Sequence, residues 1–235
     1  TDLNNESMCV GGSFAMTTVA TSVTNSVSVN YQWYNNNGTD NGNTNAISGQ
    51  TEAALTSLPT GVGSYSYRVE ATRMDDSSCK TSKTVTLVIH ALPTAMAATT
   101  TATCMSGTST ANSDGKITIS DFAASDTYQY STSNTFNSET ATPSSPMMIP
   151  MGGMIVSNLV NPVTSQQYTI RITNSDGCFI DRVVTLSAAT CNCTAPVLTD
   201  LTNESICVGG SFTMTNVTTS VTNSVSVNYQ WYNNN

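Results

Sequence analysis

Residues 63–90 read GSYSYRVEATRMDDSSCKTSKTVTLVIH and contain two alternating segments separated by a polar turn. The apolar positions of the first segment are Tyr65, Tyr67, Val69 and Ala71. Those of the second segment are Val85, Leu87 and Ile89. Successive side chains of a strand point to opposite faces, so a period of two places each set on one face of a half-buried strand. The stretch therefore predicts a closing β-hairpin, with Cys79 at the start of its last strand.

The same period of two recurs on both sides of this hairpin, whereas helical patterns are nearly absent. Val29, Tyr31 and Trp33 alternate with polar residues, and Ile117 and Ile119 do so farther along the chain. Short alternating segments separated by turn-forming Asn, Gly and Pro are typical of β-sandwiches. We therefore expect an all-β fold of tandem β-sandwich domains, in which Trp33 belongs to the core.

A second hairpin of the same kind closes the later half of the sequence. Its first strand contains Tyr168, its turn is Asn174-Ser175-Asp176-Gly177, and Cys178 follows the turn directly. In both hairpins a leucine stands eight residues after the cysteine, which makes Leu186 the counterpart of Leu87. This shared arrangement indicates two related domains.

The chain also repeats itself. Residues 2–37 and 200–235 are identical at 31 of 36 positions, with an offset of 198 residues. Such close repeats imply recent duplication within a tandem array. Since a domain commonly has about 100 residues, we expect sandwich domains at 1–92 and 93–196, and the incomplete start of the next copy at 197–235.

The composition disfavours several classes of function. Charged residues make up 9% of the chain, and its seven Lys and Arg residues leave a net charge of −8. A nucleic-acid partner or an anionic membrane surface would require clustered cations, so we expect neither nucleic-acid binding nor membrane insertion. The single histidine, His90, has no recognisable nucleophile or supporting acid near it in sequence, and we expect no enzymatic activity.

The cysteines indicate an oxidising compartment. Each 198-residue unit contains six cysteines, because Cys207 is the copy of Cys9. An even number in small β domains favours disulfides and an extracellular location. We predict the disulfides Cys9–Cys79 and Cys104–Cys178, each of which would close a loop of roughly 70 residues and contribute about 4 kcal/mol of stability.

The pair Cys191 and Cys193 lies in the connector between repeats and leaves several interpretations open. These two cysteines would form a local disulfide, or they would bond to a neighbouring domain or chain. Zinc binding is the weakest alternative, because their spacing is unusual for zinc and no second pair is near. We expect no metal or other cofactor, with calcium at a domain junction as the alternative.

Residues 145–154 read SPMMIPMGGM and are unusually rich in methionine. Proline prevents a helix here and discourages a central strand. One interpretation is a loop folded over its own domain's core. Because methionine side chains adapt to varied partners, the other interpretation is an assembly contact formed by Met147, Met148 and Met151.

Several segments resemble a known type of repeat. In the first half these are Cys9-x-Gly11, the run from Tyr31 to Tyr34, Asn37-Gly38, Gly63-x-Tyr65-x-Tyr67, and Cys79 before Thr84–Val88. Together they look like the Ig-like repeats of very large secreted surface proteins of Bacteroidota. The second half, with Cys104, residues 112–119 and residues 168–178, is similar to repeats of gliding-motility adhesins. Gln166-Gln167-Tyr168 and the methionine-rich insertion depart from that pattern.

The resemblance implies Ig-like sandwiches, type IX secretion, display at the cell surface, and a role in adhesion, motility or filamentous appendages. We therefore expect a disulfide-stapled structural repeat of an extracellular filament or giant adhesin, whose partners are other copies of the chain or adjacent repeats. The alternative is an adhesive module on a non-polymeric stalk that binds a glycan or a protein. That alternative would require an exposed aromatic platform, for which the candidates are Tyr31, Tyr34 and Tyr65.

Overall fold

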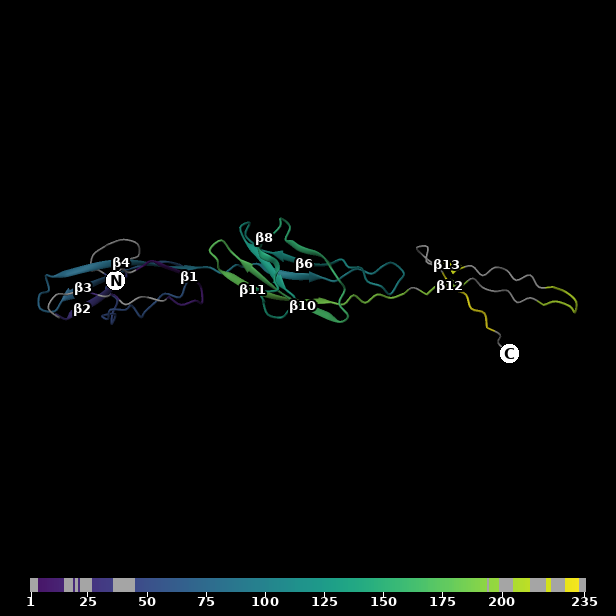
Figure 1. Ribbon diagram of the computed structural model, residues 1–235, viewed down its shortest axis with the longest axis horizontal. Coiled ribbons are helices and arrows are strands. Elements are labelled where there is room, and N and C mark those ends of the chain that lie inside the picture. Colours follow the sequence, from purple (N-terminus) through teal and green to yellow (C-terminus); the bar gives the residue numbers. More distant parts are fainter. Residues whose placement is uncertain are drawn as a thin grey trace. The chain divides into compact units, whose positions relative to one another are not determined.

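The computed structural model describes residues 4–14, 19, 21, 27–35, 45–193, 195–198, 205–211, 219–220 and 227–232. The regular elements named in these residues are all β-strands (Figure 1). The predicted all-β class is therefore confirmed. Within the same residues, no helix is long and apolar enough to cross a membrane.

The first part of the chain forms one four-stranded sheet, in the order β1-β4-β3-β2. Its strands are β1 (Glu6–Cys9), β2 (Val29–Asn35), β3 (Gly63–Arg73) and β4 (Lys80–His90). Strands β3 and β4 form the antiparallel hairpin that their alternation predicts, and Cys79 is the residue immediately before β4. Strand β1 runs parallel to β4 and thus enters the sheet without a hairpin.

One face of this sheet carries the buried core of the first region. Its buried members are Val19, Trp33, Leu55, Tyr67, Val69, Val85 and Leu87. Partly buried Phe14, Ile47 and Leu58 from the connecting segments pack against them. The Trp33 side chain is completely buried, and its indole N–H donates a hydrogen bond to the carbonyl oxygen of Glu52 at 3.0 Å. The prediction that Trp33 belongs to the core is confirmed.

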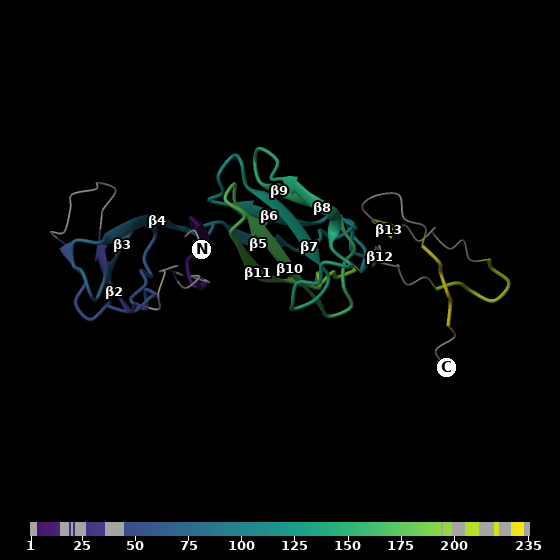
Figure 2. The same ribbon diagram turned by 60° about the vertical axis from the view of Figure 1, so that its left-hand side comes forward.

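Residues 96–187 form two further sheets (Figure 2). The three-stranded sheet has the order β5-β6-β9, with strands β5 (Met96–Thr100), β6 (Gly115–Ser120) and β9 (Met154–Leu159). The four-stranded sheet has the order β11-β10-β7-β8, with strands β7 (Thr127–Ser131), β8 (Thr142–Met148), β10 (Ser165–Thr173) and β11 (Phe179–Ser187). In β6 buried positions alternate with less buried ones, and Ile117, Ile170 and Leu186 are completely buried.

Gly115 of β6 lies close to Leu159 of the neighbouring strand β9 and to Leu186 of the other sheet. A Cβ atom at this position would lie 3.2 Å from the Cβ atom of Leu159 and 3.4 Å from Cδ2 of Leu186. Since contacts this short are rare between carbon atoms, a larger residue would force β6 away from its neighbours. The small residue at Gly115 therefore permits the close packing of this β-sandwich.

The chain divides into two compact units. The first unit consists of Thr1–Ala95, Phe122–Tyr128 and Arg171–Asp181. The second unit consists of Met96–Asp121, Gln129–Ile170 and Arg182–Asn235. The turn between β10 and β11 therefore belongs to the first unit, although the strands that flank it extend into the second. The sequence-based boundaries at 92 and 196 stay predictions.

The segment expected to begin the next copy contains two short strands in its described residues. Strands β12 (Val197–Leu198) and β13 (Thr219–Ser220) pair antiparallel and form a two-stranded sheet of their own. Most of the predicted region 197–235 lies outside the described residues.

Candidate functional site

The first of two disulfides joins Cys9, at the end of β1, to Cys178, in the turn before β11. The predicted pairing of Cys9 with Cys79 is therefore wrong. In the parallel register, Cys9 lies beside His90, which is 11 residues along β4 from Cys79. At about 3.3 Å per residue, this places the two cysteines roughly 36 Å apart. The Cα atoms of Cys9 and Cys178 are 5.5 Å apart, a usual separation for a disulfide.

The turn that presents Cys178 is organised by the side chain of Asn174. Its Oδ1 atom accepts hydrogen bonds from the N–H groups of Asp176, at 3.1 Å, and Cys178, at 2.9 Å. Gly177 adopts a φ of +80°, a left-handed conformation that glycine takes without a Cβ clash. The predicted Asn-Ser-Asp-Gly turn is thus confirmed, and it directs the completely buried Cys178 towards Cys9.

Polar contacts surround this disulfide within the first compact unit. The Asn174 side chain donates from Nδ2 to the carbonyl oxygen of Ala91 at 2.9 Å. His90 Nδ1 lies 3.3 Å from Asp176 Oδ2, and the N–H of Val10 donates to the carbonyl oxygen of His90 at 2.9 Å. The β10–β11 turn is therefore attached to the end of β4 by the Asn174–Ala91 hydrogen bond and the His90–Asp176 contact, and to β1 by the covalent bond. His90 contributes to this attachment.

The second disulfide joins Cys104 to Cys191, with Cα atoms 5.5 Å apart. The predicted pairing of Cys104 with Cys178 is therefore also wrong. Cys178 precedes β11 and Cys191 follows it, so the two occupy opposite ends of that strand. Cys104 is held beside Cys191, and its thiol sulfur is therefore not available to Cys178 at the other end.

The segment that carries Cys104 is fixed by Asp114. The carboxylate of Asp114 accepts hydrogen bonds from the hydroxyl group of Thr103 at 2.6 Å and from its N–H at 2.7 Å. These two bonds, the hydroxyl first, lower the pKa of Asp114 below its ordinary value. Asn112 also donates to the Thr103 hydroxyl at 2.7 Å. The residue next to Cys104 is therefore held by three side-chain hydrogen bonds.

Three cysteines stand outside these two disulfides, namely Cys79, Cys193 and Cys207, and all three are exposed. The Cys79 thiol lies in the β3–β4 turn and donates to Asp76 Oδ2 at 3.5 Å. Asp76 also accepts hydrogen bonds from Ser78, whose hydroxyl and N–H lower the pKa of Asp76. The alternative of a local Cys191–Cys193 disulfide is wrong, because Cys191 is bonded to Cys104. The bond to a neighbouring domain or chain stays a prediction for Cys193.

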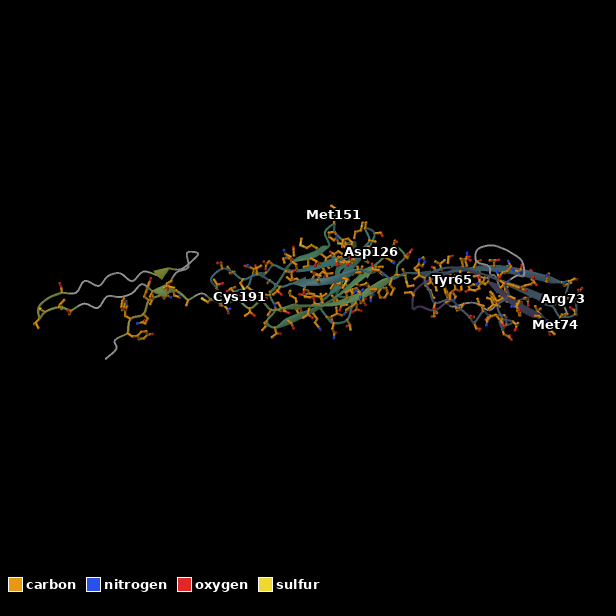
Figure 3. All side chains as sticks on the ribbon, turned by 180° about the vertical axis from the view of Figure 1, so that it is seen from behind. Tyr65, Arg73, Met74, Asp126, Met151 and Cys191 are labelled. Atoms are coloured by element: carbon orange, nitrogen blue, oxygen red, sulfur yellow. A yellow bond between two sulfur atoms is a disulfide. The ribbon has the colours of Figure 1, made fainter. Side chains whose placement is uncertain are left out.

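The methionine-rich segment joins the edge strands of two sheets. Strand β8 ends at Met148 and lies at the edge of its sheet, where its prolines remove no ladder hydrogen bond from a central strand. Ile149 is buried, whereas Met147, Met148 and Met151 are exposed. Figure 3 shows Met151 pointing away from the ribbon, in keeping with its fully exposed side chain. Buried Ile149 thus anchors the segment together with buried Gly153, and the assembly contact stays a prediction.

The three candidate tyrosines do not form an exposed platform. Tyr34 is buried, and the guanidinium group of Arg68 lies 4.3 Å from its ring centroid. Tyr31 and Tyr65 pack against the first core, and their hydroxyl groups contact Thr21 at 3.0 Å and the carbonyl oxygen of Gly61 at 2.8 Å. Their rings therefore serve the packing of the first sheet.

Among the described residues, no group of three or more His, Cys, Asp or Glu side chains is placed to hold a metal ion. The calcium alternative stays a prediction.

No protein-family model matches the chain, and no curated protein matches it. Solved structures with similar arrangements include Drosophila N-cadherin EC1-4, with 13% identity and a TM-score of 0.30 over 80% of this chain and 48% of that chain. Sidekick-1 immunoglobulin domains 1-4 give 12% identity and a TM-score of 0.35 over 81% and 48%. Murine CEACAM1b gives 13% and 0.30 over 70% and 85%. The chain spans about half the length of the first two structures, and similarity at this level assigns it no function.

Proposed function

We propose that this chain is a load-bearing structural repeat of an extracellular filament or giant surface adhesin. The observation that carries the proposal is the connectivity of the two disulfides, which bypass most of the chain. Repetition, few charged residues and a β-only architecture accompany it. Each of these features is useful in an array that must keep its length under tension.

The covalent path through one repeat is short. A pull from Cys9 to Cys191 passes through the Cys9–Cys178 disulfide and then through only 13 residues. At about 3.5 Å per extended residue, these span roughly 45 Å. Without disulfides the path contains 182 residues and would span roughly 640 Å. Residues 10–177 therefore lie off the shortest covalent path and stay shielded from the pulling force.

The second disulfide limits extension of the chain when the first disulfide is broken. If the bond between Cys9 and Cys178 is absent, the path runs from Cys9 to Cys104 and then crosses to Cys191. It then contains 95 residues and spans roughly 330 Å. The two bonds thus limit extension in two stages, which suits a mechanical role.

The biological setting that we propose follows from the sequence. Disulfides form and persist in oxidising compartments, which supports an extracellular location. The resemblance to surface repeats of Bacteroidota supports type IX secretion, with other copies of this repeat as the main partners. Because Tyr31, Tyr34 and Tyr65 are packed into the first sheet, no specific observation favours the glycan-binding alternative.

Single-molecule force spectroscopy tests this function. The chain is pulled from attachment points before Cys9 and after Cys191, with and without a reductant. We expect the fully extended length between Cys9 and Cys191 to be about 45 Å in the oxidised chain, about 330 Å for Cys178→Ser, and about 640 Å after full reduction, and each measured gain is this length minus the folded separation. A gain of several hundred ångströms in the oxidised wild-type chain would refute the load-bearing role. Cys207→Ser, which leaves both disulfides intact, is the matched control.

The proposed assembly contact has its own test. Replacing Met147, Met148 and Met151 by Ser changes three exposed side chains. We expect weaker filament formation in electron micrographs and an unchanged melting temperature of the chain. A fall in melting temperature of several degrees would instead show that the segment serves its own domain.

A further inference from the structure

The cysteines of one repeat are not all used by the two disulfides. Each 198-residue unit has six cysteines, and four of them form Cys9–Cys178 and Cys104–Cys191. Cys79 and Cys193 stand outside both bonds and are exposed. An extracellular chain with an even number of cysteines commonly pairs them all. We therefore expect Cys79 and Cys193 to form disulfides as well.

The two closing hairpins indicate what a cysteine at the position of Cys79 does. Cys79 immediately precedes β4, and Cys178 immediately precedes β11 in the equivalent hairpin. Cys178 bonds outside its own hairpin, to Cys9 in the sheet built from an earlier part of the chain. The same place in the first hairpin is therefore suited to a bond with a cysteine that comes earlier in the array.

The direction of the chain indicates that a preceding repeat would approach the first sheet from the end that carries Cys79. The parallel register pairs Glu6 with Leu87 and Cys9 with His90, and Asn5 Oδ1 accepts a hydrogen bond from the N–H of Thr86 at 2.9 Å. The chain thus enters beside the middle of β4 and runs away from the turn that holds Cys79. Figure 3 shows this turn, marked by Arg73 and Met74, at the end of the sheet opposite Tyr65.

The connector between repeats is long enough to reach Cys79. Asn203 is the copy of Asn5, and it follows Cys193 by ten residues, which span up to about 35 Å. Cys79 lies seven residues before Thr86, or about 23 Å along β4. The connector that precedes a repeat can therefore place Cys193 against the Cys79 turn of that repeat without strain.

We propose that Cys193 of one repeat forms a disulfide with Cys79 of the next repeat in the array. Both cysteines lose their thiol protons, one S–S bond forms, and two electrons pass to a low-molecular-weight or protein disulfide, which is reduced to two thiols. The partner is thus a second copy of the first sheet, presented by its β3–β4 turn. The bond encloses the connector in a covalent ring and restrains the hinge between successive repeats. This inference is independent of the load-bearing role, because it concerns only which cysteines bond.

The test uses the full chain preceded by one further copy of residues 1–198, with Cys207→Ser in the final segment. The protein is refolded in a buffer of reduced and oxidised glutathione, alkylated, and weighed as an intact chain. Four cysteines then stand outside the two observed disulfide types, namely Cys79 and Cys193 in each copy. We expect two alkylated thiols per chain, and digestion without reductant should release the peptide Met74–Lys80 bonded to the segment that contains Cys193.

Matched variants show which copy supplies each partner. Cys79→Ser in the second copy should raise the number of alkylated thiols from two to three, because it removes the partner of the first copy's Cys193. The same substitution in the first copy should lower the number from two to one. Four thiols in the parent chain, none, a doubled mass, or equal counts in the two variants would each overturn the proposal. None of these readouts depends on how the chain behaves under force.

Discussion

The segment NYQWYNNN occurs twice in this chain, at residues 30–37 and 228–235, with different outcomes. Residues 30–35 of the first copy belong to β2, where Trp33 is 0% exposed and Tyr34 is 8% exposed. In the second copy the described residues 227–232 form no strand, and Trp231 is 57% exposed. Identical sequence therefore yields a buried strand in one place and an exposed segment in the other.

The difference lies in what surrounds each copy. Trp33 pairs with Val69 on β3, and its backbone N–H donates to the carbonyl oxygen of Gln50 at 3.0 Å. The described residues 227–232 of the second copy lie in no strand. Strand stability depends mainly on cross-strand and core contacts, so an alternating pattern alone does not form a stable strand. The comparison shows that the buried strand of the first copy depends on its contacts with β3 and with the core.

The largest difference between the copies should come from their cysteines. Replacing both Cys9 and Cys178 by Ser removes a disulfide that links residues 169 positions apart. By the chain-entropy model this should lower the free energy of unfolding by about 5 kcal/mol. Cys207→Ser, in the same Cys-Val-Gly-Gly context, should change it by less than about 0.5 kcal/mol. Urea denaturation of the full chain measures both values, and equal effects would contradict the assigned pairing.

A somewhat smaller contrast is expected at tryptophan. Trp33→Ala removes a completely buried side chain and should cost about 3–5 kcal/mol of stability. Trp231→Ala removes a half-exposed one and should cost less than about 0.5 kcal/mol. The check is the shift in melting temperature of each variant. A comparable loss from Trp231→Ala would show that the second copy is packed like the first.

Gln32 and Gln230 occupy equivalent positions in the two copies and differ in their hydrogen bonds. Gln32 Nε2 donates to the carbonyl oxygens of Trp33, at 2.8 Å, and Ile47, at 3.0 Å. Gln230 Nε2 donates to that of Trp231 at 3.2 Å, in an exposed setting. Gln32→Ala should therefore cost about 1 kcal/mol, and Gln230→Ala a few tenths. Denaturant titration with small steps resolves the two losses of stability. A larger loss for Gln32→Ala is expected because the first copy is held by contacts with the rest of the first sheet, and equal losses would contradict this.

The smallest effect concerns pH and the hairpin that supports the first copy. Two hydrogen bonds from Arg73, at 2.6 and 2.8 Å, lower the pKa of Asp75 below its ordinary value of 3.8. The folded chain therefore binds this proton less tightly than the unfolded chain does. The resulting stability is present above pH 3.8 and is lost as the pH falls through the depressed pKa.

Tryptophan fluorescence during denaturation measures this loss of stability. The measurement uses the Trp231→Phe variant, in which Trp33 is the remaining tryptophan. Its emission should shift to longer wavelength at a lower denaturant concentration as the pH falls from 4 towards 2. Asp75→Asn should make this dependence less steep, because it removes one titrating group. An unchanged pH dependence in that variant would show that Asp75 does not stabilise the turn.

Much of the local structure was predictable. The alternation of residues 63–90 predicted β3 and β4, and the Asn-Ser-Asp-Gly turn predicted the hairpin between β10 and β11. These features depend on contacts between neighbours in sequence, which the residue pattern expresses directly. The methionine segment was less predictable, because buried Ile149 and exposed Met148 are adjacent apolar residues that no alternation distinguishes.

The cysteines show most clearly what the sequence could predict and what required the tertiary structure. Their number and their place beside closing strands indicated disulfides, and both observed bonds use cysteines that the sequence singled out. Six cysteines allow 15 pairings, however, and sequence order does not choose among them. The parallel placement of β1 along β4 puts Cys9 at the far end of that strand from Cys79.

By itself, then, the sequence determined the strands with clear alternation, the turn of the second closing hairpin and the repetition, because these follow from side-chain periodicity, backbone preference and sequence identity. Only the tertiary structure decided which cysteines meet and which copy of NYQWYNNN is buried. Both outcomes depend on proximity between residues that are far apart along the chain.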